Sequence, residues 1–238
     1  MRKAWFALLV LVLTALPLAA ACGGDGERAA RTPVALPSAE EVLPKVVERV
    51  EAVKSFHFRL GHEGGLSSIP LDLKLKTAEG DVLVPDRIRA ELEAEAGGAL
   101  VQVEVIGIGE EAWMTNPFSR EWQPLPSGTT ISSIFDPAAG VKAVVGSLRD
   151  VMIRGIDMVD DHETYRLEGL VDSAALEAAA PIAEPGLIVI VRVWVDVKDY
   201  TIRQVRLEGP FAPSEPANIV RILYLSKFDE PVSIEPPT

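Results

Sequence analysis

Residues 88–105 read IRAELEAEAGGALVQVEV. On each side of Gly97-Gly98, over 88–94 and 101–105, apolar side chains alternate with charged or amide side chains. A period of two places one kind of residue on each face of a strand, and paired glycines between two such runs are typical of a turn. The first run is rich in residues that favour helices, but its strict alternation indicates a strand instead. The stretch therefore predicts two antiparallel strands with one apolar and one polar face.

The same period of two recurs along most of the chain, between turn signals of glycine, proline, asparagine and aspartate. Further strands are predicted over 56–60, 69–75, 112–115, 121–125, 151–158, 163–171, 187–197, 201–208 and 219–228. The connections between successive strands are short, and no crossover unit of a parallel sheet is present. About ten antiparallel strands in one large, curved sheet are the expected result.

Three helices interrupt the strands. Ser38 and Glu41 form a capping box before a run of valines at helical spacing, in which Pro44 predicts either a kink or a helix that begins there. Two further helices are predicted over 137–148 and 173–180, capped by Asp136 and Asp172. The fold class is therefore α+β, with helices covering one face of the antiparallel sheet.

The N-terminus has the pattern of a bacterial lipoprotein signal peptide. Arg2 and Lys3 precede an apolar run that ends in Ala-Ala-Ala before Cys22, the only cysteine of the chain. We expect residues 1–21 to be removed and Cys22 to carry diacylglycerol and palmitate. A plain transmembrane anchor is the alternative. The apolar run is barely long enough to span a bilayer, however, and a transmembrane helix would not need the small residues before the cysteine.

Residues 22–37 are polar and rich in glycine and alanine, which predicts a flexible tether, and residues 38–238 are expected to form a single domain. Removal of Arg2 and Lys3 with the signal lowers the basic residues from 23 to 21 against 35 acidic ones, so the net charge changes from −12 to −14. This charge argues against binding nucleic acid or a polybasic contact with the membrane. We expect a monomer that its lipid holds at the extracytoplasmic side of a bacterial cell membrane.

Residues suited to catalysis or metal binding are few. The three histidines, His57, His62 and His162, lack the spacing of a common metal pair. The sequence contains no nucleophile elbow, zinc-protease motif, phosphate-binding loop or dinucleotide fingerprint. We therefore expect no enzyme, no metal site and no cofactor other than the covalent lipid.

A broad apolar sheet face under helices suits either a filled core or a cavity for acyl chains. Burial of each methylene gains about 0.8 kcal/mol, so such a cavity needs no polar motif. Periodicity alone favours the filled core. Under the cavity hypothesis the lining residues are Leu71, Leu73, Val103, Val193 and Val205 on strands, and Val141, Val145 and Leu148 on the second helix.

Three stretches resemble the mycobacterial LppX/LprAFG lipoprotein family: ETYRLEGLVDSAALEA at Glu163–Ala178, VWVDVKDYTIRQVRLEG at Val193–Gly209 and ILYLSKFDEPVSIEPP at Ile222–Pro237. The order of lipobox, tether, helices and strands is also similar. The resemblance is clear over 160–238, and over 38–160 it rests on element order alone.

This resemblance implies a U-shaped half-barrel around a large hydrophobic cavity, similar in fold to the periplasmic carriers of lipoproteins. It also implies an acylated lipid or glycolipid as ligand, movement of that lipid within the cell envelope, and a membrane transporter as partner. The alternative is an envelope interaction or assembly lipoprotein that acts through a sheet edge or an acidic face, without lipid cargo.

Overall fold

The computed structural model describes residues 36–69, 73–125, 137–177, 180 and 182–238. Leu36–Thr238 form one compact unit, and the predictions for Cys22, Leu71 and the tether lie outside the described residues. The elements are α1 (Ala39–Ala52), β1 (Ser55–Glu63), β2 (Ser67–Ile69), β3 (Leu73–Leu83), β4 (Arg87–Ala96), β5 (Ala99–Ile108), β6 (Glu111–Thr115), β7 (Trp122–Pro124), α2 (Pro137–Ser147), β8 (Arg149–Val159), β9 (His162–Asp172), the 3-10 helix η1 (Ser173–Leu176), β10 (Ile188–Asp196), β11 (Ile202–Glu208) and β12 (Val220–Ser226).

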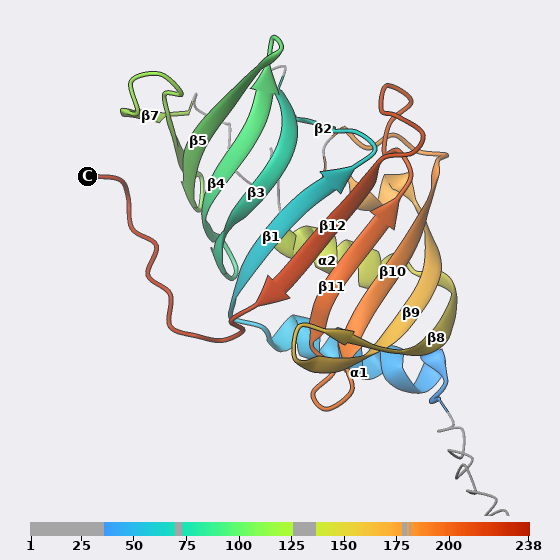
Figure 1. The fold of residues 1–238 in the computed structure, drawn as a ribbon. Coiled ribbons are helices and arrows are strands. Elements are labelled where there is room, and N and C mark those ends of the chain that lie inside the picture. Colours follow the sequence, from blue (N-terminus) through green and yellow to red (C-terminus); the bar gives the residue numbers. More distant parts are fainter. Residues whose placement is uncertain (1–35, 70–72, 126–136, 178–179, 181) are drawn as a thin grey trace, which may run out of the picture. The chain divides into compact units, whose positions relative to one another are not determined.

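Within this described part, twelve strands form one antiparallel sheet (Figure 1). Their order is β7-β6-β5-β4-β3-β1-β12-β11-β10-β9-β8, with β2 paired to β3. The sheet is open, with β7 and β8 at its two edges. The first and last strands meet at its centre, where Phe58 of β1 lies opposite Leu225 of β12. The predicted large antiparallel sheet is confirmed.

Strand β3 is longer than the alternation predicted. The prediction ended at Leu75, but a register shift between Leu75 and Thr77 moves the following residues to the opposite parity, so that Ala78 continues the buried face. Gly80 then lies so close to β4 that a Cβ atom there would approach the carbonyl oxygen of Arg89 to 2.1 Å. A pattern of strict alternation cannot follow a strand across such a bulge.

The capping box of α1 is confirmed. The Ser38 hydroxyl accepts a hydrogen bond from the amide of Glu41, and the Glu41 carboxylate accepts one from the amide of Ser38. The helix begins at Ala39, so the alternative start at Pro44 is wrong, and the proline lies inside the helix. The third predicted helix is a 3-10 turn capped by Asp172. No helix in the described ranges is long and apolar enough to cross a bilayer.

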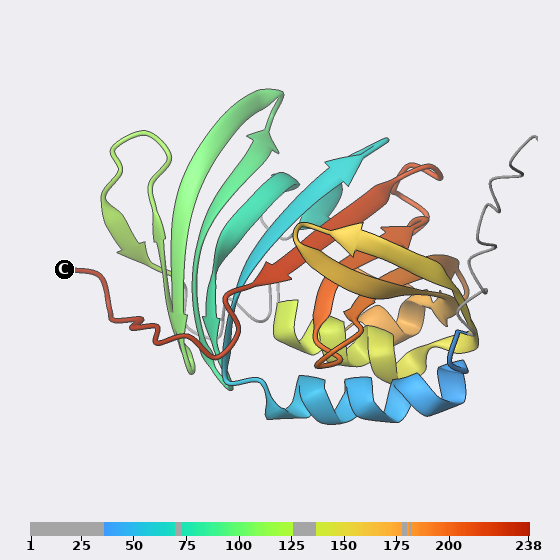
Figure 2. The same ribbon diagram turned by 60° about the horizontal axis from the view of Figure 1, so that its bottom comes forward.

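Both α-helices lie on one side of the sheet, over the half formed by β8 to β12 (Figure 2). Helix α2 contacts α1, η1 and β9, and α1 contacts β8. We call the sheet face toward these helices the inner face. Its buried side chains include Phe58, Leu75, Leu92, Val103, Leu167, Val191, Val193, Val205 and Leu225, and the helices add Val42, Val46, Val144 and Val145.

The opposite, outer face carries a row of ion pairs. Arg192 of β10 bonds Glu168 of β9 at 2.9 Å and also bonds Glu208 of β11. Arg206 joins Glu208 at 2.8 Å and Glu63 of β1 at 2.9 Å. The alternation in the sequence is therefore realised as an apolar inner face and a charged outer face.

Candidate functional site

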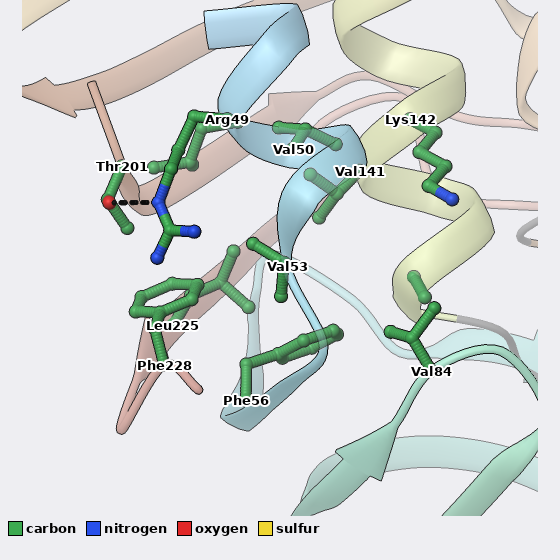
Figure 3. A pocket seen from close by; sticks show the side chains of 12 residues that line it. Arg49, Val50, Val53, Phe56, Val84, Val141, Lys142, Thr201, Leu225 and Phe228 are labelled. Carbon is green, nitrogen blue, oxygen red and sulfur yellow. Dashed lines mark hydrogen bonds between the residues drawn. The ribbon is translucent and has the colours of Figure 1, made fainter. Parts of the chain in front are cut away.

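An apolar groove lies where the C-terminal end of α1 and the first turns of α2 meet the sheet (Figure 3). Nine of its twelve described lining residues are apolar. These are Val50, Val53, Phe56, Val84, Ala138, Val141, Ile202, Leu225 and Phe228, and the others are Arg49, Lys142 and Thr201. Its volume is about 30 Å³, close to the share of a single water molecule in the liquid. The walls are therefore nearly in contact.

Two aromatic rings form one wall of the groove. Phe56 begins the inner face of β1, and Phe228 follows β12, the strand paired with β1. Their ring centroids are 6.3 Å apart, a stacked arrangement. The opposite wall is Val53 and Val141, from the end of α1 and from α2 (Figure 3). The groove is thus assembled from both ends of the domain sequence.

Arg49 closes one end of the groove. Its Nη2 atom lies 2.8 Å from Oδ2 of Asp229, and its Nε donates to Oγ1 of Thr201 at 3.1 Å. The other oxygen of Asp229 accepts the amide of Lys54 at 2.8 Å. The hydrogen bond from the Lys54 amide, with that from Arg49, lowers the pKa of Asp229 below its ordinary value of 3.8. The charge of Arg49 is therefore already neutralised within the protein.

Lys142 is the second basic residue of the groove. It belongs to α2, its side chain is exposed, and it extends on the side of the groove where Val84 lies (Figure 3). It makes no hydrogen bond or ion pair with any residue that the structure describes. The two basic groups thus differ, since Arg49 is paired and Lys142 has no partner among the residues that the structure describes.

The residues predicted to line a cavity occupy three kinds of position. Val141 lines the groove. Four others are buried in the hydrophobic core between the sheet and the helices: Val103, Val145, Val193 and Val205. Leu73 on β3 and Leu148, just after α2, are half-buried. Their role in lipid binding stays a prediction.

Most of the groove could not be predicted from the sequence. Arg49, Val84 and Phe228 come from a helix, a hairpin turn and the segment after the last strand, and none of them stands in a pattern that points to a ligand. The usable signals were the apolar faces of two of the predicted helices. The run of valines in the first helix ends with Val50 and Val53, and the second helix carries Val141. Pairing of β1 with β12 brings these parts together.

A serine and a histidine also lie in contact, away from the groove. Nε2 of His62 is 2.7 Å from Oγ of Ser67, and its Nδ1 is 2.8 Å from the carbonyl oxygen of Lys76. A carbonyl only accepts, so Nδ1 carries the proton and Nε2 accepts from the serine. Burial lowers the pKa of His62, which keeps the ring neutral. The serine is buried and also accepts from Arg221, so the pair is structural rather than catalytic.

A larger hollow of about 430 Å³ lies over the outer face of β1, β3, β4 and β5. Its lining is mostly polar or charged and includes Arg59, Glu79, Glu91 and Glu93. Such a surface does not favour acyl chains, whatever its size. No group of three or more histidine, cysteine, aspartate or glutamate side chains suited to a metal ion occurs among the described residues.

Comparison with known proteins identifies the family of the chain. The sequence model of the LppX_LprAFG lipoprotein family matches residues 38–234. The chain belongs to this family. The match covers the folded unit except its first two and last four residues. It therefore includes 38–160, where only the order of elements had supported the resemblance.

One LppX_LprAFG relative is the lipoarabinomannan carrier protein LprG of Mycolicibacterium hassiacum, which is 26% identical over 237 residues and 97% of each chain. Two solved structures share the fold. LprF of Mycobacterium bovis matches with a TM-score of 0.63, over 83% of this chain and 96% of LprF. LppX of Mycobacterium tuberculosis matches with a TM-score of 0.59, over 83% of this chain and 100% of LppX. Each is 16% identical to this chain.

These LppX_LprAFG relatives are lipoproteins and a carrier, not enzymes. The prediction that the chain is not an enzyme agrees with them. The fold class agrees as well, since the open antiparallel sheet with helices on one face matches the LprF and LppX structures.

Proposed function

We propose that this lipoprotein binds an acylated lipid or glycolipid between its helices and the inner face of its sheet, and carries that lipid within the cell envelope. The observation that carries the proposal is the apolar groove at the helix–sheet junction, in a family that includes a lipoarabinomannan carrier. The ligand would enter with its acyl chains, and its headgroup would remain at the mouth.

Entry of an acyl chain requires the groove to widen. Ligand pockets usually have volumes of about 300–1,000 Å³, far above the 30 Å³ found here. The surfaces that would separate are mostly apolar, with Val42, Val46, Val141 and Val145 on the helices. Methylenes of a lipid could replace these contacts, and each buried methylene gains about 0.8 kcal/mol. Displacement of α1 and α2 by the chain is therefore part of the proposal.

The proposal includes a membrane anchor at Cys22. Diacylglycerol and a further acyl chain on this residue would hold the protein on the extracytoplasmic side of the cell membrane, because two or more chains anchor stably. A transporter in the same membrane would supply or receive the lipid. The tether, residues 22–37, would let the groove face its lipid source.

The test is mass spectrometry of the full chain, expressed in a bacterial host and purified. Organic extracts should contain bound lipid, and Ala138→Trp, which fills the groove, should reduce its amount severalfold. Ala99→Trp is the matched control, since Ala99 is exposed at the start of β5 and lies outside the groove. Absence of lipid from the unmodified protein would overturn the proposal. In the same preparation, an N-terminus other than acylated Cys22 would contradict the anchor.

The alternative is an envelope assembly lipoprotein without lipid cargo. The hollow on the outer face favours it, because Glu91 presents a carboxylate to a partner there, beside Glu79 and Glu93, which also bond His57 and Lys76. Cross-linking in intact cells separates the two functions. A partner that is lost on Glu91→Lys but kept on Ala138→Trp, with no lipid in the extracts, would establish the alternative.

A further inference from the structure

The charge of the groove is opposite to that of the protein. Acidic residues outnumber basic ones by 35 to 23 in the chain, which gives a net charge of −12. Among the described residues that line the groove, two are basic and none is acidic. An apolar groove with a positive mouth on an acidic protein is a local feature that the overall composition does not account for.

The two basic residues do not contribute equally. Arg49 is neutralised by Asp229 at 2.8 Å and is also held by Thr201. Lys142 is exposed and lacks a partner among the described residues, and the nearby wall is the apolar Val84 (Figure 3). An ammonium group in this position can attract an anionic group whose attached chains occupy the apolar part of the groove.

We propose that Lys142 selects lipids with an anionic, phosphate-bearing headgroup. This inference rests on the proposed function and adds the headgroup class of the ligand. The acyl chains would supply most of the binding and no selectivity between headgroups. The ammonium of Lys142 would supply the selectivity, because phosphate and ammonium attract, whereas the acidic protein surface otherwise repels an anionic lipid.

The experiment compares the headgroups of co-purified lipids. The full chain, Lys142→Gln and Lys74→Gln are expressed in a host whose membrane contains phosphatidylglycerol and phosphatidylethanolamine, and the ratio of the two bound lipids is measured by mass spectrometry. Lys74 is the matched control, since it is exposed on β3, lies outside the groove and carries the same charge. Bound phosphatidylglycerol should be enriched over the membrane ratio. We expect Lys142→Gln to reduce this enrichment about three- to tenfold and Lys74→Gln to leave it unchanged.

The outcomes separate this inference from the proposed function. Absence of lipid from all three proteins would overturn the function itself. Equal ratios in the unmodified protein and in Lys142→Gln, with lipid still bound, would overturn only the headgroup selection. An excess of inorganic phosphate should leave the bound phosphatidylglycerol in place. Its displacement by inorganic phosphate would identify a simple anion site and would also overturn the inference.

Discussion

The buried ion pair between Arg221 and Glu215 offers a sharp test of how the domain is held together. Arg221 lies on β12, and Glu215 belongs to the loop between β11 and β12. Their side chains are 5% and 0% exposed, and the two charged groups are 2.5 Å apart. Glu215 also accepts the amide of Phe211 at 2.8 Å, and the Arg221 guanidinium lies 3.5 Å from the centroid of the Phe211 ring. Burial, partly offset by Glu215, lowers the pKa of Arg221.

The expected loss follows from this burial. Glu215→Gln keeps the shape of the side chain and removes its charge, which leaves the guanidinium of Arg221 without a counter-ion. Removal of one partner of a buried pair costs about 3–5 kcal/mol, a large part of the roughly 5–15 kcal/mol that stabilises a typical domain. In a domain of this size, where 1 kcal/mol shifts the melting temperature by about 2–4 °C, it should fall by about 6–20 °C.

Urea unfolding of the full chain, followed by tryptophan fluorescence and confirmed by calorimetry, gives the free energy of unfolding. The control is Glu104→Gln, which breaks an exposed pair with Arg89 at 3.4 Å and should change stability by no more than about 1 kcal/mol. Replacement of both members of the buried pair, by Glu215→Leu with Arg221→Met, should recover most of the loss. A loss in Glu215→Gln as small as that in the control would refute the reasoning, because it would mean that water already reaches the pair.

Two further predictions concern close packing and acid stability. Gly80→Ala should lower the free energy of unfolding by about 1–3 kcal/mol because its Cβ would meet backbone atoms of β4, whereas Gly146→Ala, with open space around it in α2, should raise it by about 0.5–1 kcal/mol. Equal effects in the two variants, measured by urea unfolding, would contradict the close approach. The pKa of Asp229 is held below 3.8, so its contribution to stability is fully present above that pH and is lost as the pH falls through the lowered pKa. Asp229→Asn should therefore lower stability at neutral pH and flatten its decline in acid, and an unchanged acid branch of the stability curve would count against the hydrogen bonds from Lys54 and Arg49.

Local patterns determined much of the fold. The capping box at Ser38 and Glu41 was predicted and is present, because its two hydrogen bonds join residues only three positions apart. The hairpin around Gly97-Gly98 was predicted as well, since both strands and their turn lie in one short stretch. Resemblance to the LppX/LprAFG family then added the U-shaped half-barrel form of the sheet, which alternation alone does not specify.

Other features depended on contacts between distant parts of the chain. The bulge after Leu75 moves the buried face from odd to even positions, so the alternation of the first half of β3 does not continue in phase into its second half. The burial of Arg221 and Glu215 could not be predicted, because charged residues in a strand and a loop are normally exposed.

The sequence by itself determined that this protein is an antiparallel α+β domain, that it is acidic, and that it lacks the motifs of an enzyme. Each of these properties is local or is a sum over residues. Only the tertiary structure decided where the apolar groove lies, because Phe56 and Phe228 stand at opposite ends of the domain sequence and meet through the pairing of β1 with β12. It also decided that Arg49 is paired, since its partner Asp229 is 180 residues away along the chain, and that Lys142 is exposed at the groove.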